Sequence, residues 1–142
     1  MTLTRDRRTE LLGSCRLFSG LSGEQLAAIA EIATEVQFPA QRTIVRQGEI
    51  GTGFFVVVNG RVRVVRGGEA VAHLGPGEFF GELSVLDGGP RIAMVVAEEP
   101  TTCLALASWE FERILLEQPT LALAILRELA RRLRSVSEEH RH

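Results

Sequence analysis

Apolar positions recur at helical spacing near both ends of the chain, whereas the middle holds short runs of β-branched and aromatic residues. In the segment LSGEQLAAIAEIA, Ser22 is followed three residues later by Gln25, which is the pattern of a capping box. The apolar side chains beyond this pair fall on one helix face, at Leu26, Ile29, Ala30 and Ala33. This pattern predicts an amphipathic helix that begins directly after Ser22.

The middle of the chain is rich in glycine. Eleven of the fourteen glycines lie between residues 48 and 89, where they separate the runs FFVVV, RVRVV and AVAHL. The runs MVVA and TTCLALA follow Ala93. We therefore predict a compact antiparallel β structure with tight turns. Within it, the pair Asn59-Gly60 predicts a hairpin between FFVVV and RVRVV, because this pair favours a two-residue turn.

Two helices are predicted after the β-rich region. Ser108 caps the first, WEFERILLEQ, which Pro119 ends, and the last helix begins near Thr120. The last helix carries one apolar stripe at Leu121 and Ile125. A second stripe, at 4-3-4-3 spacing, consists of Ala122, Leu126, Leu129, Leu133 and Val136. A small domain needs only one stripe for its core, so the second predicts a homodimer through this helix. The alternative is that it packs on its own domain.

Composition narrows the functional classes. A chain of 142 residues with a net charge of −2 and 45% apolar residues predicts one folded domain without a general nucleic-acid surface. All sixteen basic residues are arginine and tyrosine is absent, which excludes Schiff-base and tyrosine acid–base chemistry. The charged start MTLTRDRRTE and the short apolar runs predict no membrane segment and a cytoplasmic location. Cys15 and Cys103 lack CxxC spacing, so we expect buried, reduced thiols.

The stretch FFGELSVLDGGPRIA, residues 79–93, carries the clearest chemical signal. Gly81 precedes a short helical turn whose first N–H groups lack partners, and without a side chain there an anion can approach closely. The DGGP turn brings Arg91 back toward this anion-binding position. There its guanidinium can donate hydrogen bonds to two phosphate oxygens. Glu82 would repel a phosphate, so its partner must be a neighbouring hydroxyl donor, as on a ribose. The stretch therefore predicts a ligand in which a monoanionic phosphate is fused to a sugar with a free 2′-hydroxyl.

These residues resemble a known family. FFGELSVLDGGPRIA is similar to the phosphate-binding cassette of cyclic nucleotide-binding domains, and RQGEIGTGFFVVVNGRVRVV and GPGEFFGE are similar to the segments that precede it. The resemblance implies an α+β fold, in which an eight-stranded antiparallel β-roll of jelly-roll type lies between N-terminal helices and C-terminal B and C helices. We expect a single domain of residues 1–142, divided into a helical segment 1–34, a β-roll 35–107 with the cassette 79–93, and C-terminal helices 108–137.

The resemblance also implies a role for each residue of the site. Glu82 would bind the ribose 2′-hydroxyl with help from the Gly81 backbone, and Arg91 would bind the cyclic phosphate. The backbone amides of Ser84 and Ile92 would donate further hydrogen bonds to the phosphate. The expected ligand-binding residues are Gly81, Glu82, Leu83, Ser84, Arg91, Ile92, Ala93 and Ser137.

Departures from the family pattern bear on ligand choice. In the catabolite-activator branch, ARRL leads into a Thr-Ser pair that reaches the base, whereas ARRLRSVSEE places Val136 and Ser137 there. Ile92 stands where the family usually has alanine, serine or threonine, and Thr52 replaces a frequent aspartate. A threonine after Arg91 is associated with cGMP preference, so its absence favours cAMP over cGMP as the ligand. No cofactor is expected.

Other functions lack the residues they need. A metalloenzyme on a similar β architecture requires several inward histidines, but the chain has only His73, His140 and His142, so we expect no metal site and a regulatory domain rather than an enzyme. DNA binding requires a helix-turn-helix after the last helix, so this chain is expected to act as a stand-alone sensor or as a fragment of a longer protein. Two alternatives stay open: Glu82 and Arg91 form an internal ion pair, or the roll is a ligand-free dimerisation module.

Overall fold

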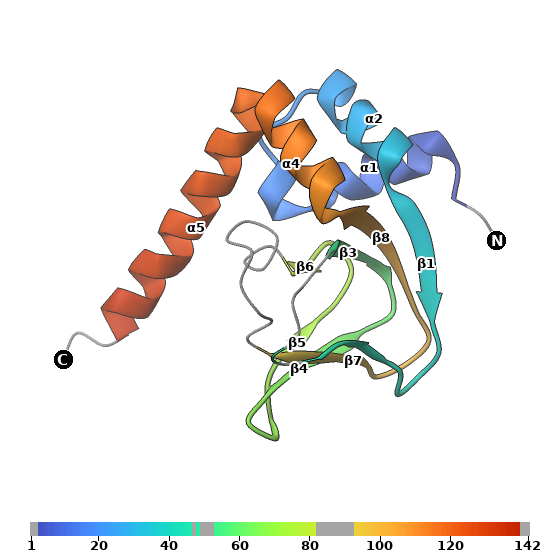
Figure 1. Cartoon of the computed structure of the whole chain (residues 1–142), viewed down its shortest axis with the longest axis vertical. Coiled ribbons are helices and arrows are strands. Elements are labelled where there is room, and N and C mark those ends of the chain that lie inside the picture. Colours follow the sequence, from blue (N-terminus) through green and yellow to red (C-terminus); the bar gives the residue numbers. More distant parts are fainter. Residues whose placement is uncertain (1–2, 47, 49–52, 82–92, 140–142) are drawn as a thin grey trace.

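The structure is a computed structural model, and it describes residues 3–46, 48, 53–81 and 93–139, with only the backbone described at 132 and 136–139. Helices from both ends of the chain gather at one end of a β-roll, and the last helix runs away from it (Figure 1). The N-terminal helices are α1 (Arg5–Ser14), the 3₁₀ helix η1 (Arg16–Phe18) and α2 (Gly23–Ile32). The C-terminal helices are α4 (Ser108–Glu117) and α5 (Pro119–Glu139).

The described part of the chain contains eight strands in two four-stranded sheets, with the orders β1-β8-β3-β6 and β2-β7-β4-β5. All the strand pairs in both sheets are antiparallel. This architecture confirms the predicted antiparallel roll between terminal helices. The strands are β1 (Thr34–Phe38), β2 (Thr43–Val45), β3 (Gly53–Asn59), β4 (Val62–Arg66), β5 (Glu69–Leu74), β6 (Phe79–Phe80), β7 (Met94–Ala97) and β8 (Thr101–Ala107).

The predicted hairpin at Asn59-Gly60 is wrong. β3 pairs with β6 and β8, whereas β4 pairs with β5 and β7, so this turn carries the chain from one sheet to the other. Gly60 has a φ of +97°, and a Cβ there would lie 2.6 Å from the carbonyl oxygen of Pro100 and from Thr101 Oγ1. The Arg61 amide also donates to Thr101 Oγ1 at 3.2 Å. The glycine is needed for this close approach rather than for a two-residue hairpin.

The hairpin in this region joins β4 to β5 instead. Its turn is Gly67-Gly68, where both residues have positive φ, +60° and +84°. The flanking pair is Arg66 opposite Glu69, which leaves two residues in the loop. Two consecutive positive φ values are the requirement of a type I′ turn, and two glycines meet it without steric cost.

The predicted helix starts are confirmed for α2 and shifted for α4. Ser22 Oγ accepts from the Gln25 amide at 3.2 Å, and Gln25 Oε1 accepts from the Ser22 amide at 2.9 Å, which completes the capping box. In α4 the cap is Ala107 and Ser108 is already helical. The Ala107 amide donates to Glu110 Oε1 at 3.0 Å, so the carboxylate three residues farther along pairs with the amide of the cap residue, and no serine hydroxyl caps the first turn. α5 begins at Pro119, one residue earlier than predicted.

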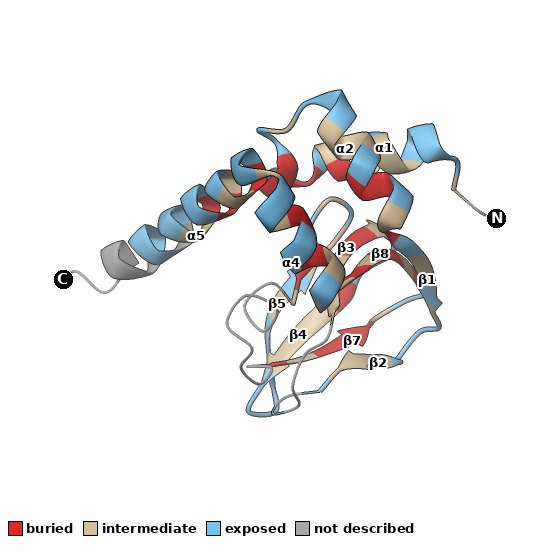
Figure 2. Cartoon of the chain, turned by 45° about the horizontal axis from the view of Figure 1, so that its top comes forward, coloured by how far each residue is buried: buried red, intermediate tan, exposed pale blue. Residues whose placement is uncertain are grey.

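Two buried clusters form the core. The first lies beneath the helices, where the Phe54 ring of β3 contacts Phe18, Phe79 and Phe111 at centroid distances of 6.0, 5.8 and 4.9 Å. Figure 2 shows buried stretches on the helices and on β3 and β8. The second cluster lies within the roll and consists of Val57, Val62, Phe80, Val95 and Cys103.

Both cysteines are buried and neither is in a disulfide, as predicted. Burial raises the pKa of the Cys103 thiol to about 12, because the apolar surroundings disfavour the charged thiolate. This cysteine therefore serves as a small apolar side chain of the core.

Candidate ligand-binding site

Most of the predicted ligand-binding residues lie outside the described part of the chain. Of the predicted residues, the structure describes Gly81 and Ala93, on either side of the undescribed part of the cassette, and the backbone of α5 at Ser137. The predicted residues outside the description are Glu82, Leu83, Ser84, Arg91 and Ile92, and Thr52 also lies outside it. What the structure contributes is the way the roll holds the ends of the cassette.

The entry to the cassette is held from both faces of β6. Phe79 and Phe80 are consecutive strand residues, so their side chains point to opposite faces. Phe79 joins the cluster beneath the helices through Phe54, while Phe80 stacks on Phe55 at a centroid distance of 5.0 Å. Their exposed fractions are only 6% and 5%. The first two residues of the cassette are therefore fixed between the two clusters.

Gly81 follows these anchors with a φ of +95°. This backbone conformation is strained for residues with a Cβ, and glycine adopts it at no steric cost. The sequence prediction required a glycine here for a different reason, namely the close approach of an anion. The positive φ is compatible with that role. It also gives a second, conformational reason why position 81 is a glycine.

The exit of the cassette is held in the other sheet. Ala93 is 7% exposed and leads into β7, which lies between β2 and β4. Val95 and Val96 of β7 are both buried. β6 belongs to one sheet and β7 to the other, so the two ends of the cassette are anchored in different sheets. A binding segment whose ends are fixed in this way has a rigid scaffold.

The two stripes of α5 have different environments. Leu121 and Ile125 are 0% and 2% exposed and belong to the cluster beneath the helices. In the second stripe, Leu126 and Leu133 are 62% and 69% exposed, whereas Leu129 is half-buried and packs against the core. Within one chain, then, the second stripe is covered only in part. The side chains of Val136 and Ser137 lie outside the description.

One residue on α5 was missed in the sequence analysis. Glu128 is only 3% exposed, although it is charged. It follows Leu121 and Ile125 at positions i+7 and i+3, so it belongs to the buried stripe. That spacing was the signal that could have identified it.

A charged cluster lies on the outside of the roll. Glu98 contacts His73 Nδ1 of β5 through Oε1, and its Oε2 lies 3.5 Å from Arg61 Nε. These contacts tie the turn before β8 to β5 and to the start of β4. Among the described residues, no group of three or more histidine, cysteine or acidic side chains could hold a metal ion.

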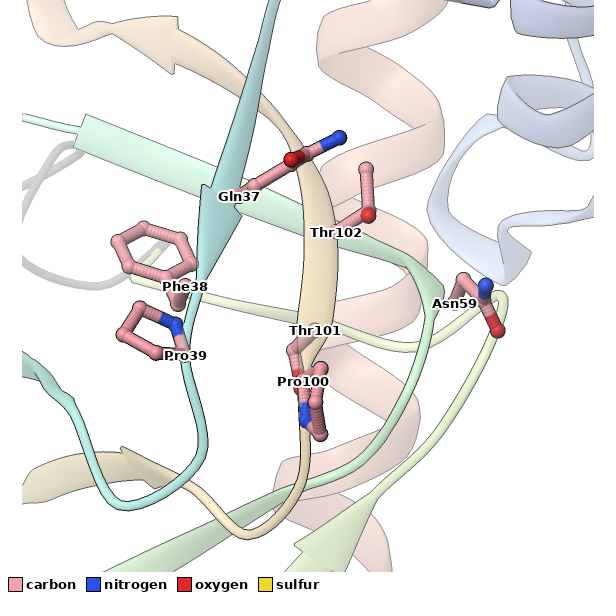
Figure 3. A pocket seen from close by; sticks show the side chains of 7 residues that line it. All are labelled: Gln37, Phe38, Pro39, Asn59, Pro100, Thr101 and Thr102. Atoms are coloured by element: carbon pink, nitrogen blue, oxygen red, sulfur yellow. The ribbon is translucent and has the colours of Figure 1, made fainter. Parts of the chain in front are cut away.

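A shallow hollow lies where β1, β3 and β8 meet their turns, with a volume of about 510 Å³. Figure 3 shows the side chains of Gln37 and Thr102 close together at its rim, with Asn59 farther along. Its lining is neutral, since it contains amides, hydroxyls, two prolines and Phe38. This hollow lacks the cation that a phosphate requires, so it does not replace the cassette as a candidate site. No helix in the described residues is long and apolar enough to cross a membrane.

Comparison with known proteins identifies the family. The cyclic nucleotide-binding domain family matches residues 35–118 of this chain, which include the whole cassette. The chain belongs to the cyclic nucleotide-binding domain family. The cyclic AMP receptor protein of Thermus thermophilus is 38% identical over 128 residues, which are 87% of this chain and 59% of that protein. The chain therefore spans less than two thirds of that relative's length.

Two solved structures have the same fold. The Thermus thermophilus catabolite activator protein matches with a TM-score of 0.81 and 37% identity, over 87% of this chain and 61% of that one. The N-terminal domain of a transcriptional regulator from Streptomyces coelicolor matches with a TM-score of 0.76 and 34% identity, over 90% and 94%. Family and fold class are thus as the sequence predicted.

Proposed function

We propose that this domain binds a cyclic nucleotide, cAMP in preference to cGMP, and that it acts as a regulatory sensor rather than as a catalyst. The observation that carries this proposal is the family match over residues 35–118, which spans the cassette from end to end. The relative from Thermus thermophilus is named as a cyclic AMP receptor, which supports cAMP as the ligand. The absence of a threonine after Arg91 supports the same choice.

The proposed contacts follow the chemistry of each residue. Arg91 binds the cyclic phosphate with its planar fork, and Glu82 accepts the ribose 2′-hydroxyl. The amides of Ser84 and Ile92 donate to the phosphate, next to the Gly81 backbone. Leu83 and Ala93 complete the cassette, and Ser137 on α5 contacts the base. The positive φ of Gly81 and the anchored ends of the cassette support this assignment.

The second stripe of α5 supports a homodimer. Leu126 and Leu133 leave most of their side-chain area in water in a single chain, and apolar surface of this kind favours burial against a partner. A twofold copy of α5 offers a matching stripe through Ala122, Leu126, Leu129, Leu133 and Val136.

Calorimetry with cAMP and cGMP tests the proposed function. The unmodified chain should bind cAMP more tightly than cGMP. Arg91→Ala should weaken cAMP binding by about 3 kcal/mol, since a partly buried phosphate loses its counter-charge. The matched control is Arg66→Ala, at an exposed arginine at the end of β4, which should leave affinity unchanged. Glu82→Ala should narrow the difference in affinity between cAMP and its 2′-deoxy analogue.

Two results would refute parts of this proposal. Unchanged cAMP affinity in Arg91→Ala would remove the phosphate assignment, and an unchanged 2′-deoxy difference would make Glu82 structural. If the folded, unmodified chain binds neither nucleotide, the ligand-free dimerisation module becomes the better interpretation.

Substitutions at position 92 are expected to tighten nucleotide binding, whereas the substitutions above weaken it. An isoleucine side chain beside a phosphate provides no hydrogen bond, although its backbone amide still donates. Ile92→Ser should therefore tighten cAMP binding by about 1 kcal/mol if one good hydrogen bond forms. Ile92→Thr should improve cGMP more than cAMP, because its hydroxyl could also meet the guanine amino group. Calorimetry on both variants checks this, and weaker or equal binding in both would contradict it.

A further inference from the structure

The turn between β1 and β2 contains a strained residue. Gln41 has a φ of +68°, and in the described part of the chain it is the only residue other than glycine with a positive φ. The Arg42 amide donates to the Pro39 carbonyl at 3.2 Å, so residues 39–42 form a β-turn with Gln41 at its third position. Glycine or asparagine usually occupies this position when φ is positive, so the choice of glutamine calls for an explanation from its side chain.

The side chain of Gln41 holds an arginine of β4. Its Oε1 accepts from Nη1 and Nη2 of Arg63, both at 3.3 Å, and its Nε2 donates to the Glu98 carbonyl at 3.3 Å. The Gln41 amide donates to the Ala97 carbonyl at 2.6 Å, which ties the turn to the end of β7. The glutamine is thus fixed through both its backbone and its side chain, and it sets the direction of the Arg63 guanidinium.

These hydrogen bonds orient Arg63 without neutralising it. A carboxamide oxygen carries no net charge, and no carboxylate of the described residues forms an ion pair with this guanidinium. Gln41 uses one N–H of each Nη atom, so the guanidinium keeps further donors for another acceptor. An oriented arginine with an uncompensated charge is suited to bind an anionic group.

A neighbouring carboxylate shows which kind of anion this surface accepts. Glu98 contacts His73 Nδ1 through Oε1, and its Oε2 lies 3.5 Å from Arg61 Nε. His73 is the residue opposite Arg63 in the β4–β5 ladder. The side chains of Arg61 and His73 are 54% and 46% exposed. The surface therefore already binds one carboxylate next to Arg63, and it remains open to solvent.

The charge of this surface limits what else can bind there. If His73 is counted as neutral, the three arginines and two glutamates of the surface give it a net charge of +1. These five residues are Arg42, Arg61, Arg63, Glu98 and Glu99. One excess positive charge matches a single carboxylate, whereas a phosphate group carries nearly two negative charges and would also face both glutamates.

An apolar side chain is exposed beside these polar groups. The β4–β5 register shifts between Val64 and Val65, and Val71 is the extra residue of this β-bulge. Val71 is 54% exposed and lies two residues before His73 on β5. An exposed aliphatic group next to a cationic position favours a peptide ligand over an inorganic anion, because a peptide can cover both.

We propose that Arg63, His73 and Val71 form a docking surface for an acidic segment of a partner protein. An aspartate or glutamate of the partner binds Arg63, and a neighbouring apolar side chain of the partner covers Val71. Gln41 is the positioning residue of this surface, because it orients Arg63. β4, β5 and β7 lie away from helices α1, α2 and α4 (Figure 1). The proposal does not rest on nucleotide binding, since no cassette residue takes part.

Nuclear magnetic resonance of the isotope-labelled chain, without nucleotide, tests this proposal. The probe is an end-blocked peptide of sequence Ser-Leu-Glu-Leu-Ser, and the control peptide has glutamine in place of glutamate. Titrated to millimolar concentration, the acidic peptide should shift the side-chain Nε–H signal of Arg63 and the amide signals of Val71 and His73. The control peptide should bind about tenfold more weakly, because it lacks the charge-assisted hydrogen bonds.

Substitutions separate a role in binding from a role in folding. Arg63→Ala should weaken binding of the acidic peptide about tenfold. Arg66→Ala, at an exposed arginine of the same strand, is the matched control and should change it less than about twofold. Gln41→Gly should weaken binding about threefold while the melting temperature stays equal or rises, because glycine adopts the positive φ without strain. A purely structural glutamine would give the reverse, a lower melting temperature with unchanged binding.

Four outcomes would overturn the proposal. If the acidic peptide leaves the Arg63 signal unchanged, or if Arg66→Ala weakens binding as much as Arg63→Ala, there is no specific surface. If inorganic phosphate binds as tightly as the peptide, the position is a phosphate site. If the same signals shift with protein concentration alone, a second copy of this chain is the occupant. Unchanged binding in Gln41→Gly would refute its positioning role. A failure to bind cAMP would affect only the proposed function, because these measurements need no nucleotide.

Discussion

The stripe of Leu121 and Ile125 and the stripe of Leu126 and Leu133 run along the same helix, and both consist of large aliphatic residues. In the structure the first stripe is buried and the second is largely exposed. The difference arises outside the helix, because α5 contacts η1 and α4, and the first stripe is the one that joins the cluster beneath the helices. The comparison teaches that an apolar stripe predicts that a helix face will be buried. The neighbouring elements determine which surface covers that face.

The largest expected contrast comes from placing a charge in each stripe at adjacent residues. Ile125→Asp should lower the free energy of unfolding by about 4 kcal/mol, because the carboxylate would be buried among apolar side chains. Leu126→Asp is the matched control and should change it by less than about 0.5 kcal/mol. Urea denaturation followed by circular dichroism, at a concentration where the chain is monomeric, measures both. Equal losses would mean that both stripes are covered within one chain.

A smaller contrast is expected from removing side-chain volume. Leu121→Ala should cost about 3 kcal/mol of unfolding free energy, since it leaves a cavity at a fully buried site. Leu133→Ala should cost less than about 0.5 kcal/mol, because this side chain is 69% exposed. The same denaturation experiment provides the comparison. A large loss in Leu133→Ala would show that the second stripe contributes to the folded monomer.

The smallest expected effect concerns self-association. Leu133→Asp should weaken the proposed dimer by about 2 kcal/mol, roughly thirtyfold in dissociation constant, because it places a charge in the seam. Sedimentation equilibrium should show this shift, while the melting temperature of the monomer stays unchanged. Leu129→Asp should affect both quantities, because Leu129 also packs against the core. If the unmodified chain is monomeric at high concentration, the exposed leucines have another role.

Local sequence signals predicted the features that neighbouring residues determine. The capping box of Ser22 and Gln25 forms as expected, because its hydrogen bonds join residues only three positions apart. The cassette motif indicated the family for a similar reason, because the proposed phosphate-binding residues all lie within one short stretch. Positive φ at Gly60 was also expected, because glycine is the residue that tolerates it.

The pairing of strands was not determined locally. Asn59-Gly60 satisfies the sequence requirements of a hairpin turn, yet β3 and β4 lie in different sheets. The decisive contact is between Gly60 and the chain at Pro100 and Thr101, about forty residues away in the sequence. A turn motif describes the local backbone, and it carries no information on which strand will lie alongside.

By itself, the sequence determined the type and approximate bounds of the helices, the β character of the middle, the location of the cassette and the family to which it belongs. These properties depend on local periodicity and on contiguous chemistry. Only the tertiary structure decided that Phe79 and Phe80 hold the cassette from two separate clusters, and that its ends lie in different sheets. It also decided that Glu128 is buried between two arginines. Each of these depends on residues that are distant in sequence, and such contacts exist only once the elements have packed.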